Sequence, residues 1–284
     1  MTAAEFIYTV ILRPAPLRSF ANWVLRAGTP KMVRRHGANI VLNSSDPVVS
    51  GALTLRVYER DETEFFLSAF RPGMTLLDVG ANIGYYTALA LAIMKGNGRI
   101  IALEPDPENF SYLLKTVAAN GGGNVECVQK AASDHIGSMT LFTNSNNRGD
   151  NRLYANQLAT STCQVDVTPV DVLLSGMGVS AVDFIKIDVQ GYEGHVLAGM
   201  RETIRKSPRL TLLSEFWPEG LRNAGTAPEA YMSELAACGF QLFELHEKGR
   251  LEEVKNPAAL ISRYTGRQYT NIVGVKGAGD RRYA

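Results

Sequence analysis

The chain has 284 residues, of which 45% are hydrophobic, and a formal net charge of +1; this length suits one large α/β domain, or one domain with a short appendage. The near-neutral charge gives no global electrostatic support for a nucleic-acid partner, and no stretch approaches the roughly 18 consecutive apolar residues of a membrane-spanning helix. Three cysteines, Cys127, Cys163 and Cys238, have no metal-ligand spacing, and their odd number indicates a reducing compartment, so we expect a cytoplasmic protein.

Residues 1–45 are predicted to form a basic helical extension or lid. The apolar run 6–12 follows Glu5 rather than a basic region, which argues against a signal peptide. Residues 6–45 contain Lys and Arg but no acid, and the apolar residues at 17, 20, 21, 24 and 25 recur at helical spacing. Two interpretations stay open: a lid helix with its arginines in water, or a surface for an anionic substrate, a carrier lipid or a membrane face.

The rest of the chain, residues 46–284, alternates strands and helices. Helices are predicted at 61–70, with Asp61 as the cap, at 85–94, from Asp106 to about 120, after Gly191, and between 226 and 239. Strands are predicted at 74–79, 98–105, 124–131, 137–142, 163–170, 182–189, 209–216, 240–245 and 270–275. The polar run 144–157 predicts a long surface loop of the kind that is usually functional or mobile. Near-continuous apolar strands between helices indicate a mainly parallel sheet covered on both faces.

The segment LLDVGANIGYYT, residues 76–87, places Asp78 at a strand end, directly before a glycine-flanked turn. Ligands of open α/β sheets bind beyond the carboxyl ends of the strands. Asp78, Glu104, Asp134 and Asp188 all fall at or just after predicted strand ends. A parallel sheet would therefore gather these acids along one edge.

The turn does not fit a dinucleotide site or a phosphate-binding loop. Asn82 occupies the place of the middle glycine in G-x-G-x-x-G, and no Gly-Lys-Ser/Thr follows. An acid directly before the turn would repel a phosphate but would suit an ammonium group. Glu104 can accept bonds from both ribose hydroxyls, and an acid after the third strand can accept from an adenine amine. Ammonium, ribose and adenine together describe S-adenosylmethionine.

The blocks LLDVGANIGYYT, IALEPDPENFSYLLKTVAAN, VQKAASD, VDVTPVDVLL and DFIKIDVQGYEGHVLAGM, in this order, resemble the FkbM-type methyltransferases. The resemblance covers roughly residues 45–275, and IKIDV-x-G-x-E is its most specific element. It implies a Rossmann-like class I methyltransferase fold, with a seven-stranded, mostly parallel sheet whose last strand is antiparallel. It also implies methyl transfer from S-adenosylmethionine, usually to a hydroxyl of a sugar, polyketide or other secondary metabolite.

The resemblance also assigns cofactor-binding positions along this chain. It assigns the methionine-side turn to Asp78, Gly80, Ala81, Asn82 and Gly84, and the ribose to Glu104 with Pro105 and Asp106 beside it. Ser133 and Asp134 correspond to the adenine edge, and Asp188 is a further cofactor-binding candidate. The family usually has Glu where this chain has Gln190, which counts against an ionised base or metal ligand at that position.

Methyl transfer requires mainly that the acceptor be aligned and its proton removed. Asp188 is the first candidate base, although it could instead hold the cofactor or cap the next helix. Lys186 lies on the same strand face and either pairs with Glu215 or Asp188 or steers the acceptor hydroxyl. His195 is either a solvated side chain or a base. No compact ligand pattern is present, so metal independence is predicted.

The sequence thus predicts an enzyme that O-methylates a hydroxyl-bearing small molecule or glycan. Tyr58 and Glu59 are candidates for closing over the cofactor, and the aromatic pair after Glu215 either lines an acceptor pocket or packs the sheet edge. The alternatives are a nucleic-acid methyltransferase, a non-catalytic binding module that contacts a membrane or carrier through residues 1–40, and an NAD-dependent oxidoreductase. Asp188-Val189-Gln190-Gly191 differs from the Asp/Asn-Pro-Pro-aromatic motif of base amino-methylases, and Asn82 argues against NAD.

Overall fold

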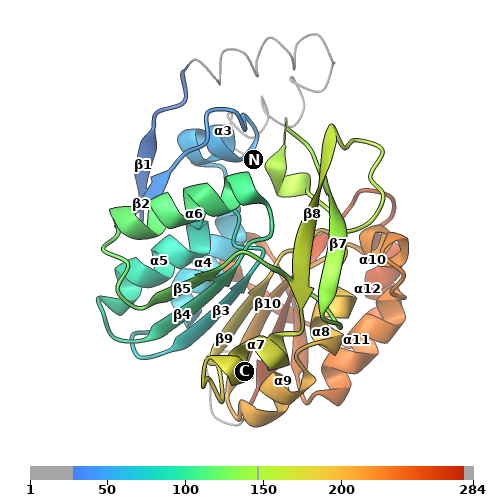
Figure 1. Ribbon diagram of the computed structural model, residues 1–284. Coiled ribbons are helices and arrows are strands. Elements are labelled where there is room, and N and C mark those ends of the chain that lie inside the picture. Colours follow the sequence, from blue (N-terminus) through green and yellow to red (C-terminus); the bar gives the residue numbers. More distant parts are fainter. Residues whose placement is uncertain (1–27, 146, 278–284) are drawn as a thin grey trace.

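A computed structural model describes residues 28–145 and 147–277 of the chain. Its main sheet consists of β3 (Thr75–Val79), β4 (Arg99–Leu103), β5 (Val125–Val128), β9 (Phe184–Ile187), β10 (Leu210–Phe216), β11 (Gln241–Leu245), β12 (Leu251–Glu253) and β13 (Thr270–Lys276). These eight strands lie in the order β12-β11-β13-β10-β9-β3-β4-β5 (Figure 1).

The sheet confirms the predicted class I methyltransferase fold. Strands β5, β4, β3, β9 and β10 are parallel to one another, and β13 runs antiparallel between β10 and β11. One strand exceeds the predicted seven, because the short β12 pairs with β11 at the edge. Its three residues, LEE, are too few and too polar to predict a strand.

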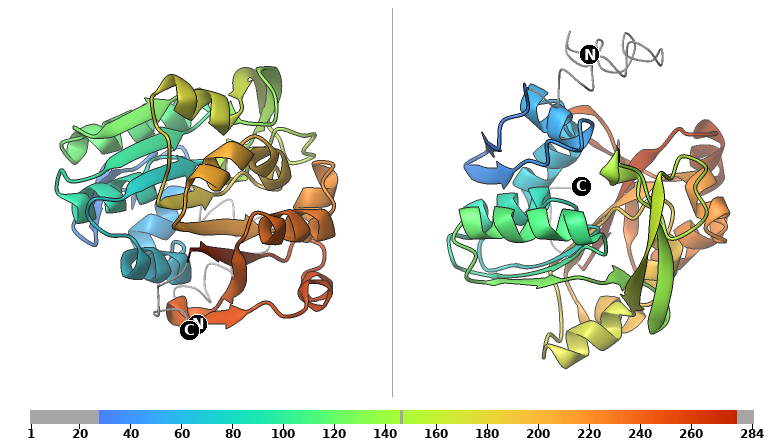
Figure 2. Two further views of the ribbon diagram at one scale, coloured as in Figure 1. Left: turned by 90° about the horizontal axis from the view of Figure 1, so that it is seen from below. Right: turned by 45° about the horizontal axis from the view of Figure 1, so that its top comes forward.

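Helices cover both faces of the sheet (Figure 1; Figure 2). They are α3 (Val49–Leu55), α4 (Arg60–Ala69), α5 (Tyr85–Met94), α6 (Pro107–Ala119), α7 (Val170–Gly176), α8 (Glu193–Ala198), α9 (Arg201–Lys206), α10 (Pro218–Asn223), α11 (Pro228–Ala237) and α12 (Pro257–Arg263). Side chains alternate along a strand, so Leu76 packs with the α4–α6 layer whereas Leu77 packs with the α7–α12 layer. Burial on both faces explains the continuous apolar runs that predicted the strands.

Of the two helix caps predicted for α6 and α4, the first is confirmed and the second is wrong. Asp106 caps α6 as predicted, because its carboxylate accepts the backbone N–H groups of Glu108 and Asn109. The predicted cap of α4 at Asp61 is wrong: the helix begins at Arg60, and Glu59 is the cap residue in a left-handed conformation.

Two smaller sheets flank the main one. A hairpin of β1 (Met32–Arg35) and β2 (Ala38–Val41) packs its buried residues Ala38 and Ile40 into the core on the α4–α6 side. This described part of the predicted extension is therefore a hairpin, while the helix predicted over residues 17–25 lies outside the described residues.

The predicted strands 137–142 and 163–170 form the second small sheet rather than joining the main one. It contains β6 (Ala131–Ala132), β8 (Ser161–Thr168) and β7 (Gly137–Thr143), in that order. The polar run 144–157 connects β7 to β8 and includes the 3-10 turn Arg148–Asp150. None of the helices in residues 28–145 and 147–277 has the length and apolar character needed to cross a bilayer.

Candidate active site

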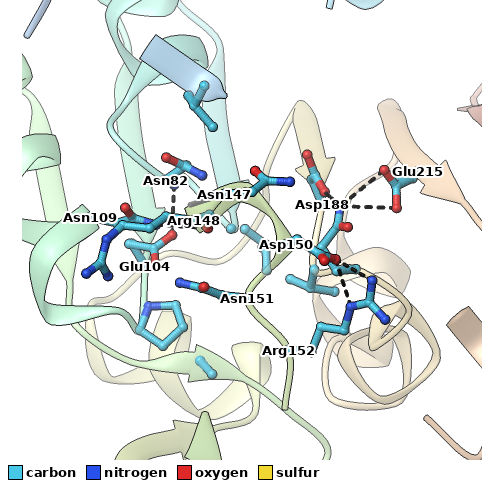
Figure 3. Close-up of a pocket in the computed structure, with 18 of the residues that line it drawn as sticks. Asn82, Glu104, Asn109, Asn147, Arg148, Asp150, Asn151, Arg152, Asp188 and Glu215 are labelled. Carbon is cyan, nitrogen blue, oxygen red and sulfur yellow. Dashed lines mark hydrogen bonds and ion pairs between the residues drawn. The ribbon is translucent and has the colours of Figure 1, made fainter. Parts of the chain in front are cut away.

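A cavity of about 360 Å³ opens at the carboxyl ends of the central parallel strands. Each strand contributes residues at or just beyond its end: Gly80 and Asn82 after β3, Glu104 and Pro105 after β4, Asp188 and Gln190 after β9, and Glu215 and Trp217 from the end of β10. Figure 3 shows Glu104 and Asn82 on one side of this cavity and Asp188 and Glu215 on the other. Of the four acids predicted to converge, Glu104 and Asp188 line the cavity, whereas Asp78 and Asp134 do not.

The turn after β3 is shaped by a close approach of two chains. Gly80 has a φ of +80°, and a Cβ at this position would collide with the backbone carbonyl oxygen of Asp188. The ends of β3 and β9 can lie together only because this residue has no side chain. The glycine thus leaves room in the cavity and brings Asp188 to its wall.

Glu104 is held in place by backbone amides. Its carboxylate accepts the N–H of Asn82 at 2.8 Å and the N–H of Asp106 at 2.9 Å, and the residue is only 5% exposed. Burial, together with the neighbouring Asp106 carboxylate, raises the pKa of Glu104 to about 8. An oriented carboxylate that still lines the cavity can accept bonds from a vicinal diol.

Three residues of the cavity wall hold left-handed backbone conformations without being glycine. They are Glu59 with φ 37°, Asn82 with φ 52° and Gln190 with φ 54°. Such strain persists where surrounding structure enforces it, and it concentrates at binding and catalytic sites. Of these three residues, only Asn82 is of a type that tolerates this conformation, so only its conformation could be expected from the sequence.

Three carboxylates gather on the β9–β10 side of the cavity. The amide Nε2 of Gln190 donates to Asp188 Oδ1 at 2.9 Å and to both carboxylate oxygens of Glu215 at 3.2 Å. Lys186 Nζ lies 3.4 Å from Asp188 Oδ2 and 5.0 Å from the ring centroid of Tyr86. The third carboxylate belongs to Glu59, whose Oε2 atom is buried and makes no hydrogen bond within the described residues.

The charges of this group act on one another strongly. Burial, and then the Asp188 carboxylate, raise the pKa of Glu215 well above its usual range. Burial also raises the pKa of Glu59, although the Lys186 ammonium opposes this. Burial acts to lower the pKa of Lys186, but Asp188 and Glu59 outweigh it and raise that pKa. These raised pKa values favour the protonated forms of Glu215 and Glu59, and a cationic ligand would favour their ionised forms.

Residues 78–242 of the chain match the methyltransferase FkbM domain, the family whose motifs the sequence resembles. The chain belongs to the FkbM methyltransferase family. It is 27% identical over 177 residues to methyltransferase sdnD of Sordaria araneosa, an alignment that covers 52% of this chain and 68% of that protein. It is also 44% identical over 62 residues to the ribosomal RNA large subunit methyltransferase E of Legionella pneumophila (strain Lens), covering 20% of this chain and 30% of that one.

Among solved structures, the FkbM methyltransferase from Methylobacillus flagellatus KT aligns with a TM-score of 0.47 and 17% identity. The alignment covers 91% of this FkbM-family chain and 59% of the Methylobacillus chain. This chain therefore spans less than two thirds of that structure's length.

Not every predicted site residue of this FkbM-family chain reaches the cavity. Gly80, Asn82, Glu104, Pro105 and Asp188 line it, whereas Asp78, Ala81, Gly84, Asp106, Ser133, Asp134, Lys186 and His195 do not. Asp78 is 1% exposed, its carboxylate accepts the Thr87 hydroxyl at 2.7 Å, and burial raises its pKa to about 6. Gly84 instead starts α5, where a Cβ would press on Leu113.

Asp134 and His195 belong to a separate polar cluster. Asp134 Oδ2 lies 3.0 Å from His195 Nδ1, and Asp134 Oδ1 lies 2.7 Å from His135 Nδ1. His195 Nε2 lies 2.9 Å from the carbonyl oxygen of Ala224, and the Ser133 hydroxyl lies 3.2 Å from Asp134 Oδ1. These contacts join α8 to the segment after α10 and leave His195 bonded on both ring nitrogens away from the cavity.

The described residues give no metal-binding arrangement. In residues 28–145 and 147–277, no group of three or more His, Cys, Asp and Glu side chains is placed to hold an ion. Metal independence stays a prediction.

The 144–157 loop forms one wall of the cavity through residues 147–153. Arg148 bonds Asp106 Oδ2 at 2.8 Å and also pairs with Glu108, and its backbone N–H donates to Asp46 at 3.2 Å. Farther along, the Arg152 guanidinium pairs with Asp150 and lies 4.6 Å from the Trp217 ring centroid. The loop is therefore fastened on both sides of the cavity.

We expect Arg148→Ala to lower the free energy of unfolding by about 2 kcal/mol, because it leaves the buried Asp106 without its cation. The side chains of Arg148 and Asp106 are 15% and 2% exposed. Urea denaturation measures the loss, and hydrogen exchange of residues 144–157 should accelerate. Arg205→Ala, which breaks an exposed pair with Glu202, is the matched control. An equal loss in both variants would show that the loop contact contributes nothing specific.

Proposed function

We propose that the protein is an S-adenosylmethionine-dependent O-methyltransferase that acts on a hydroxyl of a small molecule, a sugar or glycan, or a secondary metabolite. The observation that carries this proposal is that Glu104 faces the Asp188–Glu215 carboxylate pair across one cavity. Family membership supplies methyl transfer as the reaction class. We place the activity in the cytoplasm, which the three free cysteines support.

The cavity residues fit this cofactor. Glu104, anchored by two amides, is suited to the ribose hydroxyls. The cationic methionine end suits the Glu59 carboxylate, a role that the predicted Asp78 cannot take while it is buried against Thr87. Pro105, Ala131 and Ala132 offer an apolar wall for the adenine. When bound, S-adenosylmethionine supplies an activated methyl group, so the protein has to orient the acceptor and remove its proton.

Asp188 is the group that we assign to proton removal. Gln190 and Lys186 each approach one of its carboxylate oxygens, which fixes the carboxylate and leaves a lone pair on each oxygen for the acceptor hydroxyl. Lys186 is 3% exposed and does not line the cavity, so it acts as a positioning residue. Trp217, Tyr58 and Tyr269 give the cavity aromatic surfaces against which a ring or sugar could pack.

Calorimetric titration with S-adenosylhomocysteine tests the cofactor assignment through Glu104. Gln at this position would turn an amide donor toward the N–H of Asn82 or Asp106, so we expect Glu104→Gln to weaken binding about 10- to 100-fold. Ribose hydroxyls favour the ionised carboxylate and lower its pKa from about 8 on binding. Wild-type affinity should therefore rise as the pH increases toward 8 and then level off.

The exposed Glu202→Gln is the matched control and should leave the affinity unchanged. Thermal unfolding of Glu104→Gln separates a lost fold from a lost contact. Failure of the folded wild type to bind S-adenosylhomocysteine at any pH would refute the proposed function. Unaltered binding by Glu104→Gln would refute the ribose assignment alone.

A further inference from the structure

A second cavity, of about 440 Å³, lies beside the first and is lined mainly by basic side chains. Its wall comes from the β1–β2 hairpin, the end of α3 and the first turn of α4. The basic residues that line it are Arg34, Arg35, His36, Arg56 and Arg60. Glu64 is the acidic side chain among its described lining residues.

The positive charge of this cavity is only partly neutralised. The side chains of Arg34 and Arg56 form no ion pair within the part of the chain that the structure describes. Arg35 donates to the carbonyl oxygens of Leu53 and Thr54 at the end of α3, which holds its guanidinium at the cavity wall. Burial, and then the Arg56 cation, lower the pKa of Arg35, so the positive charges of Arg35 and Arg56 repel each other.

The first turn of α4 also lies at this wall. The helix is ten residues long, and no side chain caps its first turn. Two acids of that turn are engaged elsewhere: Asp61 accepts the N–H of Lys248, and Glu62 accepts the side-chain amide of Asn271. The arrangement suits an anion that accepts several charge-assisted hydrogen bonds.

Tyr58 lines both cavities and therefore marks where they meet. Its ring packs edge-on against Tyr85 at 5.2 Å, and the Tyr85 hydroxyl lies 3.1 Å from the Thr63 hydroxyl. On the far side of Tyr58 stand the carboxylates of Glu59 and Asp188, which repel an anion. A ligand that carries an anionic group and a hydroxyl would therefore be bound in one orientation, with its hydroxyl toward Asp188.

We infer that the basic cavity binds a phosphate ester group of the methyl acceptor, while the acceptor's hydroxyl enters the first cavity past Tyr58. The substrate class is thus a hydroxylated phosphate ester, a chemistry shared by soluble sugar phosphates and by phosphate-bearing lipid headgroups. The identity of this ligand as the acceptor rests on the proposed function, whereas the phosphate site itself does not.

The test compares the wild type with Arg34→Gln/Arg56→Gln, which removes two exposed cations without disturbing the helix-end contacts of Arg35. Inorganic pyrophosphate and glucose 1-phosphate are titrated by calorimetry, and vesicles of phosphatidylcholine with or without phosphatidic acid are tested by flotation. We expect the double variant to weaken phosphate binding about tenfold or more. Arg250→Gln, an exposed arginine outside both cavities, is the control. S-adenosylhomocysteine is titrated into every variant and should bind equally.

Binding of pyrophosphate and glucose 1-phosphate that depends on the two arginines supports a soluble ester, and binding of phosphatidic acid vesicles alone supports a lipid headgroup. Absence of binding to every phosphate probe, or equal binding by the double variant, overturns the inference and leaves the proposed function untouched if S-adenosylhomocysteine still binds. Conversely, phosphate binding without S-adenosylhomocysteine binding overturns the acceptor assignment together with the proposed function. Displacement of S-adenosylhomocysteine by pyrophosphate would show that the two ligands share one cavity, and would also overturn the inference.

Discussion

Replacing Asp188 with Asn is expected to lower kcat by about 100- to 10,000-fold, the usual contribution of a positioned general base. The substitution keeps the size of the side chain and the acceptor oxygen that Gln190 contacts at 2.9 Å. It removes the negative charge that can take the hydroxyl proton, and it turns an amide or an uncharged oxygen toward Lys186. The fold should survive, since the residue sits beyond the end of β9 rather than in the core.

The measurement is single-turnover transfer of a labelled methyl group to a hydroxylated acceptor that the wild type methylates. Asp166→Asn is the matched control, because Asp166 is an exposed residue of β8 with one long ion pair, to Lys130 at 3.8 Å. S-adenosylhomocysteine affinity must be measured in parallel. If turnover and cofactor affinity fall together, Asp188 holds the cofactor and is not the base. If turnover stays within a few-fold of the wild type, Glu215 or Glu59 has to take that role.

Parts of the site could be predicted because local sequence determines them. The apolar runs of β3, β4, β9 and β10 predict where the strands end, and the fold then brings residues just past those ends together. Glu104 follows β4 and so reaches the cavity, as expected. Asp106 combines a cap with a following proline, a pattern that identifies a helix start whatever surrounds it.

The position of Asp78 shows what local sequence does not determine. Asp78 lies inside β3, beside Ala102 of β4 and Lys186 of β9, and one more residue of the strand follows it. Side chains alternate, so a shift of one residue at the strand end decides whether an acid faces the ligand or the core. The predicted strand 74–79 ends at the same residue as β3, so the strand end was predicted correctly. The face taken by Asp78 was not, and its side chain is buried against Thr87 of α5.

Other features depend on contacts between distant segments. The ion pairs of Arg148 with Asp106 and Glu108 join residues about 40 positions apart. The basic cavity joins a hairpin turn to two helix ends, and two of its arginines, Arg34 and Arg35, fall in the predicted helical extension 1–45. The His195 cluster likewise depends on where Ala224 comes to lie. A polar residue near a predicted strand end is therefore only a candidate until its neighbours in space are known.

Gly80→Ala is expected to abolish S-adenosylhomocysteine binding and to lower the free energy of unfolding by about 3 kcal/mol or more. Two effects add here. The residue has a φ of +80°, which costs a non-glycine residue about 1–2 kcal/mol. The new methyl group would also collide with the carbonyl oxygen of Asp188, a backbone atom held by β9. This collision is avoided only if the ends of β3 and β9 separate, which moves Asp188 away from the cavity.

Gly121→Ala separates these two effects, because Gly121 has a φ of +78° but open space around the position of a Cβ. Its expected cost is about 1 kcal/mol, with cofactor affinity unchanged. Urea denaturation and calorimetric titration of both variants therefore measure the steric contribution by difference. Equal losses of stability would mean that the strand ends give way easily. The contact at Gly80 also places the general base beside the bound cofactor. If this contact is rigid, stability and cofactor affinity should fall together in Gly80→Ala. If the strand ends give way, both quantities should equal those of the Gly121→Ala control.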